Sequence, residues 1–510
     1  MNLNKQIKYI WLVAFASVLT FTSCKKEFFD INDSPNSPKE LQLSEILPTV
    51  QLAIGQALGN DLKAAGGIWS QYWTQNTGAS RYRIYDLYNI SNESQRAAWL
   101  LLYNDALTDL NYIIKKGNEK SIPNYVAIAT ILKAYNFQVL TDAYGDIPFS
   151  EAGKAEEGIY SPKYDSQKDV YDGIIRLLKE GISKIDEASD LHPVFDDLIY
   201  QGNMHLWRKF ANTTLLKVYL RLSNVDPGKA QAGIAALQAE SAKFIDYVAQ
   251  NKEIAKIDYT ATGGNSNPLY SSFVGMGKVK NLVASASAVN AFTAYGDTRL
   301  AKFYLPIPGG AFLGIPNGYL GQPNTGGFVT PPKALSYPAN ITGGRPEISA
   351  ATATAPVVFI SDFESYFLQA EAVERGWMTG NAKKLYEDGI SINYLFLDLP
   401  IGNGSPYEAY IATPEVSYDL QADKFKAIYF QKWFAMCGIQ NFEAWTEGRR
   451  TGYIADNMGA TLADNKFFTL SLTAGANPLP ARMLYPNSEV TANGKFPGQQ
   501  LLSTKVWWAK

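Results

Sequence analysis

The stretch from Gly66 to Ile90, GGIWSQYWTQNTGASRYRIYDLYNI, holds the densest group of residues suited to binding a ligand. Aromatic rings stack on flat apolar surfaces such as the C–H faces of sugar rings, and the amide and guanidinium groups between them can bind hydroxyls. The residues that we predict to contact a ligand here are Trp69, Tyr72, Trp73, Arg81, Tyr82 and Tyr85.

An alternative interpretation applies to the first half of this stretch. Its first three aromatic residues lie at offsets of 0, 3 and 4, which places them on one face of a helix, and aromatic residues at that spacing more often belong to a core. The segment at residues 78–80 contains a glycine and breaks the helix. We therefore expect Tyr82 and Tyr85, which follow the break, to be exposed.

A second candidate for ligand binding is the loop from Gly309 to Phe328, where the predicted contact residues are Phe312, Asn317 and Tyr319. The alternative is a loop that packs on the surface without binding anything. This loop belongs to a longer segment, residues 260–356, that is rich in Gly, Pro, Asn and Ser. Because the segment also carries aromatic residues, which disordered chains usually lack, we predict an ordered irregular subdomain.

Motifs for catalysis are absent from the sequence. It has no Gly-x-Ser-x-Gly elbow, no phosphate-binding loop and no cluster of metal ligands, and it contains 2 His and 2 Cys. A calcium-binding role for Asp196 and Asp197 is a disfavoured alternative to solvated or capping carboxylates. We predict no enzymatic activity, no metal and no cofactor. The formal net charge of −2 also argues against nucleic acid as a partner.

Helical periodicity dominates the rest of the chain and predicts the elements that position these residues. We expect helices over residues 95–116, 125–144, 170–185, 205–222, 228–248, 360–377, 382–396 and 424–447. Several follow one another after short turns, and Ala382, Tyr386 and Gly389 have the small–aromatic–small spacing that lets tetratricopeptide helices approach closely. Because no strict 34-residue period is present, we favour a helical scaffold with long insertions over a regular array.

The residue pattern of the helix predicted over 424–447 indicates a structural role rather than ligand binding or catalysis. Cys437 shares a face with two aromatic residues, so we expect it to be a small buried hydrophobic residue. Arg449 or Arg450 is expected to form a buried ion pair with Glu443 or Glu447 rather than to bind a substrate.

The N-terminus has the pattern of a bacterial lipoprotein signal. Lys5 and Lys8 precede an apolar stretch of 12 residues, which is too short for a bilayer span of about 20 residues. Two small residues then lead directly to Cys24. We predict lipidation of the Cys24 thiol, because several acyl chains anchor a protein stably; the alternative is an ordinary signal peptide with a chance cysteine.

These features predict the domain organisation. We expect a signal peptide at residues 1–23, a flexible polar tether at 24–40 and a single domain at 41–510, with the loop-rich insertion at about 260–356.

Taken together, these motifs resemble the SusD/RagB-like family of nutrient-binding outer-membrane lipoproteins of the Bacteroidetes. The resemblance rests on the lipobox at Cys24, DINDSPNSP (30–38), TDAYGDIPFSEA (141–152), YLRLSNVDPGKA (219–230), FLQAEAVERGWMTGNAKKLYEDGI (367–390), QKWFAMCGIQNFEAWTEGRRTGY (431–453) and NPLPARMLYPNSEVTAN (477–493). These stretches span nearly the whole chain in the order expected for the family.

The resemblance implies a mostly α fold, in which tetratricopeptide-like helix pairs form a right-handed superhelical scaffold and an irregular loop-rich subdomain faces the ligand. It implies a lipid-anchored, surface-exposed protein of the outer membrane. Such a protein captures oligosaccharides and acts as the lid of a SusC-like TonB-dependent transporter. The alternatives are a peptide-binding member of the same family, a helical-repeat scaffold for envelope assembly, and a surface glycoside hydrolase.

Overall fold

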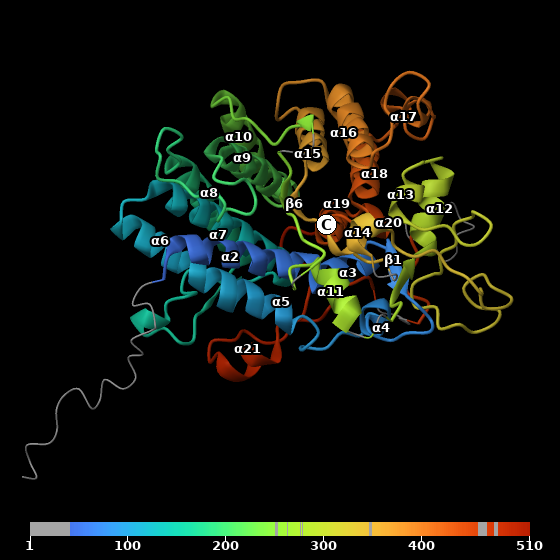
Figure 1. Ribbon diagram of the computed structural model, residues 1–510, viewed down its shortest axis with the longest axis horizontal. Helices are drawn as coiled ribbons and strands as arrows, with labels where there is room; N and C mark the ends of the chain where they lie inside the picture. The colour runs from blue at the N-terminus through green and yellow to red at the C-terminus, as the bar shows by residue number, and fades with distance from the viewer. Residues whose placement is uncertain are drawn as a thin grey trace, which may run out of the picture. The chain divides into compact units, whose positions relative to one another are not determined.

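α-Helices form most of the structure, which is a computed structural model of the chain (Figure 1). It describes residues 41–249, 253–262, 264–275, 277, 279–345, 349–456, 467–473 and 478–510. The predicted signal peptide, Cys24 and the tether lie outside the described residues. Residues Leu43–Lys510 form one compact unit.

The helices of the body fall into two groups along the chain. The first group comprises α2 (Leu43–Gly59), α3 (Asp61–Trp69), α5 (Arg96–Leu100), a π-helical segment (Leu101–Leu107), α6 (Thr108–Glu119), α7 (Pro123–Tyr144), α8 (Gln167–Ser183), α9 (Met204–Arg221) and α10 (Pro227–Ala239). The second comprises α15 (Asp362–Glu374), α16 (Ala382–Phe396), α18 (Lys424–Met436), α19 (Asn441–Thr451) and α20 (Tyr453–Asp456). Most of the first group occupies the left half of Figure 1, and the second group lies to its right.

Consecutive helices pack as pairs, α7 with α8, α9 with α10 and α15 with α16. Each pair meets at a glycine: a Cβ atom added at Gly181 would lie 2.6 Å from Ile131, one at Gly389 would lie 3.0 Å from the Phe367 ring, and one at Gly233 would overlap the Tyr219 ring. Only a residue without a side chain allows helices to come this close. The predicted mostly α scaffold of helix pairs is therefore confirmed.

Two of the predicted helices have different limits in the structure. The helix expected over 228–248 ends at Ala239, where the chain turns through Ser241 with a φ of 53°. The helix expected over 95–116 contains the π-helical segment and continues to Glu119.

The helix expected over 424–447 is two helices. α18 ends before Cys437 and α19 begins at Asn441. Gly438 makes the break, because its φ of 69° favours glycine and a Cβ atom there would lie 2.4 Å from the Thr342 side chain. The break turns α19 away from the line of α18, so that its charged residues face the centre of the body. Cys437 itself is buried, as predicted.

Three short antiparallel strand pairs tie distant segments together. They join β1 (Trp73–Gln75) to β5 (Leu282–Ala284), β2 (Ile147–Pro148) to β3 (Tyr164–Asp165), and β4 (Ala255–Ile257) to β6 (Val357–Ile360). The β1–β5 pair matters most for function, because it connects the aromatic stretch after α3 to the insertion.

Within its described residues, the segment predicted as a loop-rich insertion consists mainly of irregular structure. It contains the short helices α11 (Pro268–Gly275), α12 (Ala286–Ala294), α13 (Leu300–Phe303) and α14 (Ala350–Ala353). Three further short helices lie elsewhere: α4 (Arg83–Asp86), α17 (Pro406–Ile411) and α21 (Asn487–Ala492). Within the described residues, no helix has the length and apolar character needed to cross a membrane.

A network of buried charges, which we call the charge network, lies at the centre of the body. Its members are Asp142 on α7, Lys217 and Arg221 on α9, Glu364 and Glu371 on α15, Lys432 on α18, and Glu443, Glu447 and Arg450 on α19. Arg221 Nη2 lies 2.6 Å from Glu443 Oε1, and Lys217 Nζ lies 2.7 Å from Glu364 Oε1. Burial makes each of these charges costly without its partners.

The predicted ion pair at the end of α19 forms with one of the two arginines. Arg450 Nη2 lies 2.8 Å from Glu447 Oε2 and 2.6 Å from Glu371 Oε2. Arg449 instead stacks on the Trp445 ring, with its guanidinium carbon 3.5 Å from the ring centroid, and donates to the Ala481 carbonyl.

Candidate functional site

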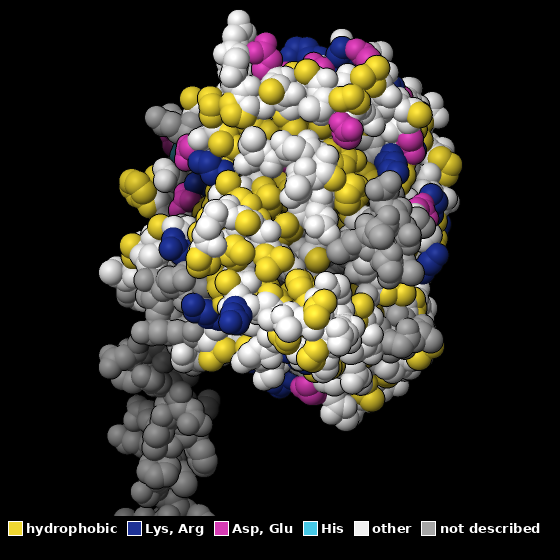
Figure 2. Space-filling model, turned by 90° about the vertical axis from the view of Figure 1, so that its right-hand side faces the viewer, with side chains coloured by type: hydrophobic (Ala, Val, Ile, Leu, Met, Phe, Trp, Pro, Cys, Tyr) yellow, Lys and Arg dark blue, Asp and Glu magenta, His cyan; other side chains and the backbone are white. Residues whose placement is uncertain are grey.

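The structure brings together the two stretches that the sequence singles out for ligand binding. The turn at residues 76–83, the insertion loop at 305–337 and the segment 467–473 meet on one side of the molecule, and we call this surface the loop face. Arg83 Nη1 lies 3.4 Å from the Tyr319 carbonyl, and the Leu472 amide donates to the Asn317 carbonyl at 2.9 Å. Figure 2 views this side, where hydrophobic side chains gather in the middle and charged ones lie mostly toward the rim.

The first three aromatic residues of the predicted site belong to the core, as the alternative interpretation expects. Trp69, Tyr72 and Trp73 are fully buried. The Trp69 ring packs 4.9 Å from the Trp445 ring, and the Tyr72 hydroxyl donates to the Trp433 carbonyl. Contact with a ligand needs an exposed ring face, which none of the three has in this structure.

The predicted exposure of Tyr82 and Tyr85 is wrong. Their exposed fractions are 1% and 4%. After the break at Gly78 the chain folds back as the short helix α4, and the Tyr82 amide donates to Gln75 Oε1 at 2.7 Å. The Tyr85 ring then packs edge-on against Trp69 at 5.9 Å, and its hydroxyl donates to the Ser94 carbonyl. The prediction failed because these contacts come from residues on both sides of the break.

Asn317 and Tyr319 also hold the structure together rather than facing solvent. Asn317 Nδ2 donates to the carbonyls of Ile68 and Trp73, both at 3.3 Å, and its Oδ1 accepts from Ser285 Oγ. These bonds fasten the insertion loop to α3 and β1. Tyr319 is buried in a small second core that supports the loop face.

A buried carboxylate fixes the base of the loop face. Asp86 accepts hydrogen bonds from Thr74 Oγ1 at 2.7 Å and from the Gly318 amide at 2.8 Å. Burial raises the pKa of Asp86 to about 6, although these bonds oppose the shift. The carboxylate thus connects the aromatic stretch to the insertion loop.

Two of the predicted contact residues do reach the surface: Arg81 is exposed and Phe312 is half-buried. The other apolar residues of the loop face are aliphatic or partly covered rings. They include Leu320, Val329, Leu470 and Leu472, which are exposed, and Phe328, Tyr337 and Phe467, which are half-buried. Sequence reasoning missed the four aliphatic residues, because single aliphatic residues in a loop have no periodicity that marks them as surface contacts.

A cleft of about 300 Å³ adjoins the loop face, and we call it the Tyr295 cleft. Its lining combines aromatic and polar side chains: Tyr295, Tyr386 and Phe430 with Glu415, Gln421, Asp423, Lys426 and Gln431. The Tyr295 ring lies 5.9 Å from the ring of Phe467, which belongs to the loop face. Sequence reasoning did not find this cleft because its residues come from α16, α18 and the segments before α13 and α18.

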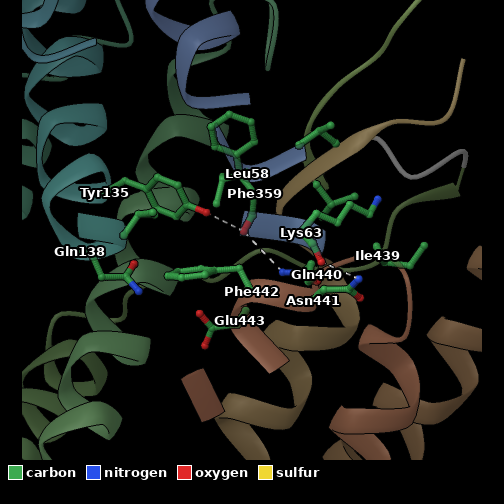
Figure 3. A pocket seen from close by; sticks show the side chains of 13 residues that line it. Leu58, Lys63, Tyr135, Gln138, Phe359, Ile439, Gln440, Asn441, Phe442 and Glu443 are labelled. Atoms are coloured by element: carbon green, nitrogen blue, oxygen red, sulfur yellow. Dashed lines mark hydrogen bonds between the residues drawn. The ribbon is translucent and has the colours of Figure 1, made fainter. Parts of the chain in front are cut away.

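A second cavity, drawn in Figure 3, is too small for a sugar. It has about 20 Å³ of space, which suits one water molecule. Tyr135 and Gln440 both donate to the Phe359 carbonyl beside it. Lys63 also lines this cavity, and no described residue forms a hydrogen bond or ion pair with its Nζ. Burial lowers the pKa of Lys63 to about 7.

Asp196 and Asp197, the pair for which calcium is the disfavoured alternative, accept hydrogen bonds from protein donors. Asp197 accepts from Gln51 Nε2, from Trp207 Nε1 and from the Gly202 amide, at 2.7 to 2.9 Å. Asp196 accepts from the Tyr125 hydroxyl at 2.7 Å. These bonds fix the loop between α8 and α9. Within the described residues, no group of three or more His, Cys, Asp and Glu side chains is arranged to hold a metal ion.

Comparison with known proteins gives a consistent result. A protein-family model for SusD-like proteins, described as starch-binding and associating with the outer membrane, matches residues 35–486. No match was found among curated proteins. Among solved structures, a chitin-binding protein is similar at 26% identity with a TM-score of 0.71, and the alignment covers 91% of this chain and 99% of that one.

Two further solved structures share the fold. A SusD homologue from Bacteroides uniformis has 24% identity and a TM-score of 0.74, with 92% of this chain and 100% of that one covered. A chitin-binding SusD homologue from Flavobacterium johnsoniae has 22% identity and a TM-score of 0.72, with 91% and 98% covered. Because the family match extends over most of the chain, this protein belongs to the SusD-like family of proteins that associate with the outer membrane.

Proposed function

We propose that the protein is a cell-surface lipoprotein that captures oligosaccharides on its loop face and delivers them to a TonB-dependent transporter. The observation that carries this proposal is the family match over residues 35–486, together with a chitin-binding protein that is 26% identical over 91% of the chain. The protein binds its ligand and performs no bond chemistry on it.

The loop face has the composition that oligosaccharide capture requires. Its exposed aliphatic side chains and half-buried rings can cover the C–H faces of sugars, while Arg81 at its edge can bind hydroxyls. The Tyr295 cleft extends this surface with amide and carboxylate groups that suit the same hydroxyls. An open surface of this kind suits a long oligomer, since no sugar has to enter an enclosed pocket.

Attachment and delivery complete the proposal. Lipid on Cys24 would anchor the mature chain, and residues 24–40 would act as the tether that lets the body reach a neighbouring barrel. The body then serves as a lid that closes over the SusC-like transporter with its ligand. In this scheme the lipoprotein captures the ligand and the transporter carries it across the membrane, so the two proteins must associate.

A screen of an oligosaccharide array that also carries peptides tests the ligand class. We expect binding to one family of glycans, with no new reducing ends when the bound glycan is recovered. Binding to peptides alone would assign the protein to peptide capture, and new reducing ends would identify a hydrolase. Either outcome would overturn the proposal.

Gentle solubilisation of the membrane tests the transporter partnership. We expect the lipoprotein to co-purify with a barrel protein, and replacement of Cys24 by Ala to abolish its attachment to the membrane. Recovery of the wild-type lipoprotein without a barrel would remove the support for a lid.

A further inference from the structure

A cavity of about 150 Å³ lies beside the charge network, between α15, α18 and α19. Its lining includes the buried residues Glu371, Tyr429, Lys432, Glu447 and Arg450 and the more exposed residues Arg375, Phe425, Tyr453 and Lys510. The space is several times that of a water molecule. Its lining shares no residue with the loop face or the Tyr295 cleft, so a ligand bound here is independent of the surface proposed for oligosaccharides.

Two buried polar groups line this cavity without a hydrogen-bond partner among the described residues: the Tyr429 hydroxyl and the Lys432 ammonium. Tyr429 and Lys432 are 4% and 3% exposed. Leaving a buried donor unsatisfied destabilises a protein by about 1–3 kcal/mol. Both groups therefore favour a bound acceptor in the cavity.

The charges around the cavity do not balance. Glu447 is the ion-pair partner of Lys432, with Nζ 3.1 Å from its Oε2, but it is also the partner of Arg221 and Arg450. Glu371 is shared in the same way by Arg450 and Arg375.

The remaining charges near the cavity have partners of their own. Arg221, which also contacts Glu447, has Glu443 and Asp142 as further partners, and Lys510 pairs with Asp456. Around the cavity itself, Arg375, Lys432 and Arg450 thus face two carboxylates. The excess of one positive charge suits a single anion.

The available donors also indicate which kind of anion the cavity can bind. Arg450 uses its guanidinium N–H groups on Glu371, Glu447, Ser223 and the Leu220 carbonyl, so it contributes charge and no free donor. The free donors are an ammonium and a hydroxyl, which can each bind one oxygen of a carboxylate. Phe425 also lines the cavity, and the guanidinium carbon of Arg375 lies 4.9 Å from the centroid of its ring.

We propose that this cavity binds a small monoanion of the carboxylate type, with one oxygen accepting from Lys432 Nζ and the other from the Tyr429 hydroxyl. A free organic acid and the carboxylate of an acidic sugar share this chemistry. Binding would satisfy both donors and neutralise the excess charge at the centre of the body.

Titration calorimetry at constant ionic strength tests the site, with sodium acetate, glucuronate, glucose and chloride as probes. We expect acetate and glucuronate to bind and glucose and chloride to give no signal. Tighter binding of glucuronate than of acetate would show that the cavity also recognises the sugar ring of an acidic sugar. Equal binding would show that it recognises only the carboxylate group. Binding of glucose as tight as that of glucuronate would overturn the proposal, as would the absence of binding by both carboxylates.

Two variants test the donors. Tyr429→Phe keeps the ring and removes the hydroxyl, and we expect it to weaken acetate binding about tenfold, as for the loss of one hydrogen bond to a charged group. Lys432→Met should abolish binding. Tyr259→Phe is the matched control, because the Tyr259 hydroxyl is also buried without a partner among the described residues but lies outside the cavity. If Tyr429→Phe bound acetate as tightly as Tyr259→Phe, the proposal would be wrong even if Lys432→Met failed to fold.

Discussion

The charge network and the loop face are stabilised in different ways. In the network, side chains of opposite charge meet from five helices; Glu371 and Glu443 each pair with two cations, and Glu447 pairs with three. In the loop face, single uncharged amides bind backbone groups: Gln71 bonds Thr469, and Asn317 bonds Ile68 and Trp73. The body therefore depends on charged residues that share partners, so that replacing one of them leaves others buried and unpaired. The loop face keeps its backbone while its outward side chains stay free to suit a ligand.

Replacement of Arg221 by Met should have the largest effect on stability. It would leave Glu443, Glu447 and Asp142 without a buried cation that all three now share, and breaking a buried pair in this way costs about 3–5 kcal/mol. Urea-induced unfolding measures the change. The control is Lys384→Met, which removes an exposed pair with Asp388 and should change stability by about 0.5 kcal/mol or less. Equal effects of the two variants would contradict the special role of the network.

Lys63 differs from the cations of the charge network, because it is buried without a carboxylate partner among the described residues. Its pKa is about 7 in the folded protein and 10.5 when unfolded, so the wild type should gain stability as the pH rises from about 7 to about 10.5. Lys63→Met should lack this gain and should be more stable at pH 7 by on the order of 2–4 kcal/mol. Unfolding curves across this pH range measure the difference, and parallel curves for the two proteins would show that Lys63 has a partner.

Replacement of Gln71 by Met should act locally on the loop face. The variant leaves the Thr469 N–H and carbonyl without their partner and should cost about 1–3 kcal/mol. Hydrogen exchange should accelerate in residues 467–473 and stay unchanged in α15 and α18. Gln369→Met is the control, since Gln369 bonds only within its own helix. Faster exchange throughout the body would mean that the two regions are not separate.

The helical body was largely predictable from the sequence, and the chemistry of its surface was not. The helix at 382–396 was predicted at its observed limits, because the spacing of Ala382, Tyr386 and Gly389 is a local signal. Arg221 and Glu443 are 222 positions apart in the sequence, and no local sequence pattern indicates that they form an ion pair. The burial of Tyr82 and Tyr85 also escaped prediction: Tyr85 packs against Trp69 on the other side of the break and accepts from Gln95, and no helical spacing indicates these contacts.

The central claim, capture of an oligosaccharide on the loop face, is tested most directly by one calorimetric comparison. The wild type and a Phe312→Ala/Phe328→Ala variant are titrated with the tightest-binding glycan from the array, beside a Phe195→Ala control that removes a ring 85% exposed on another loop. We predict that the double variant binds about tenfold more weakly or worse, and that the control binds like the wild type. Unchanged binding by the double variant, or binding lost in the control, would contradict the account.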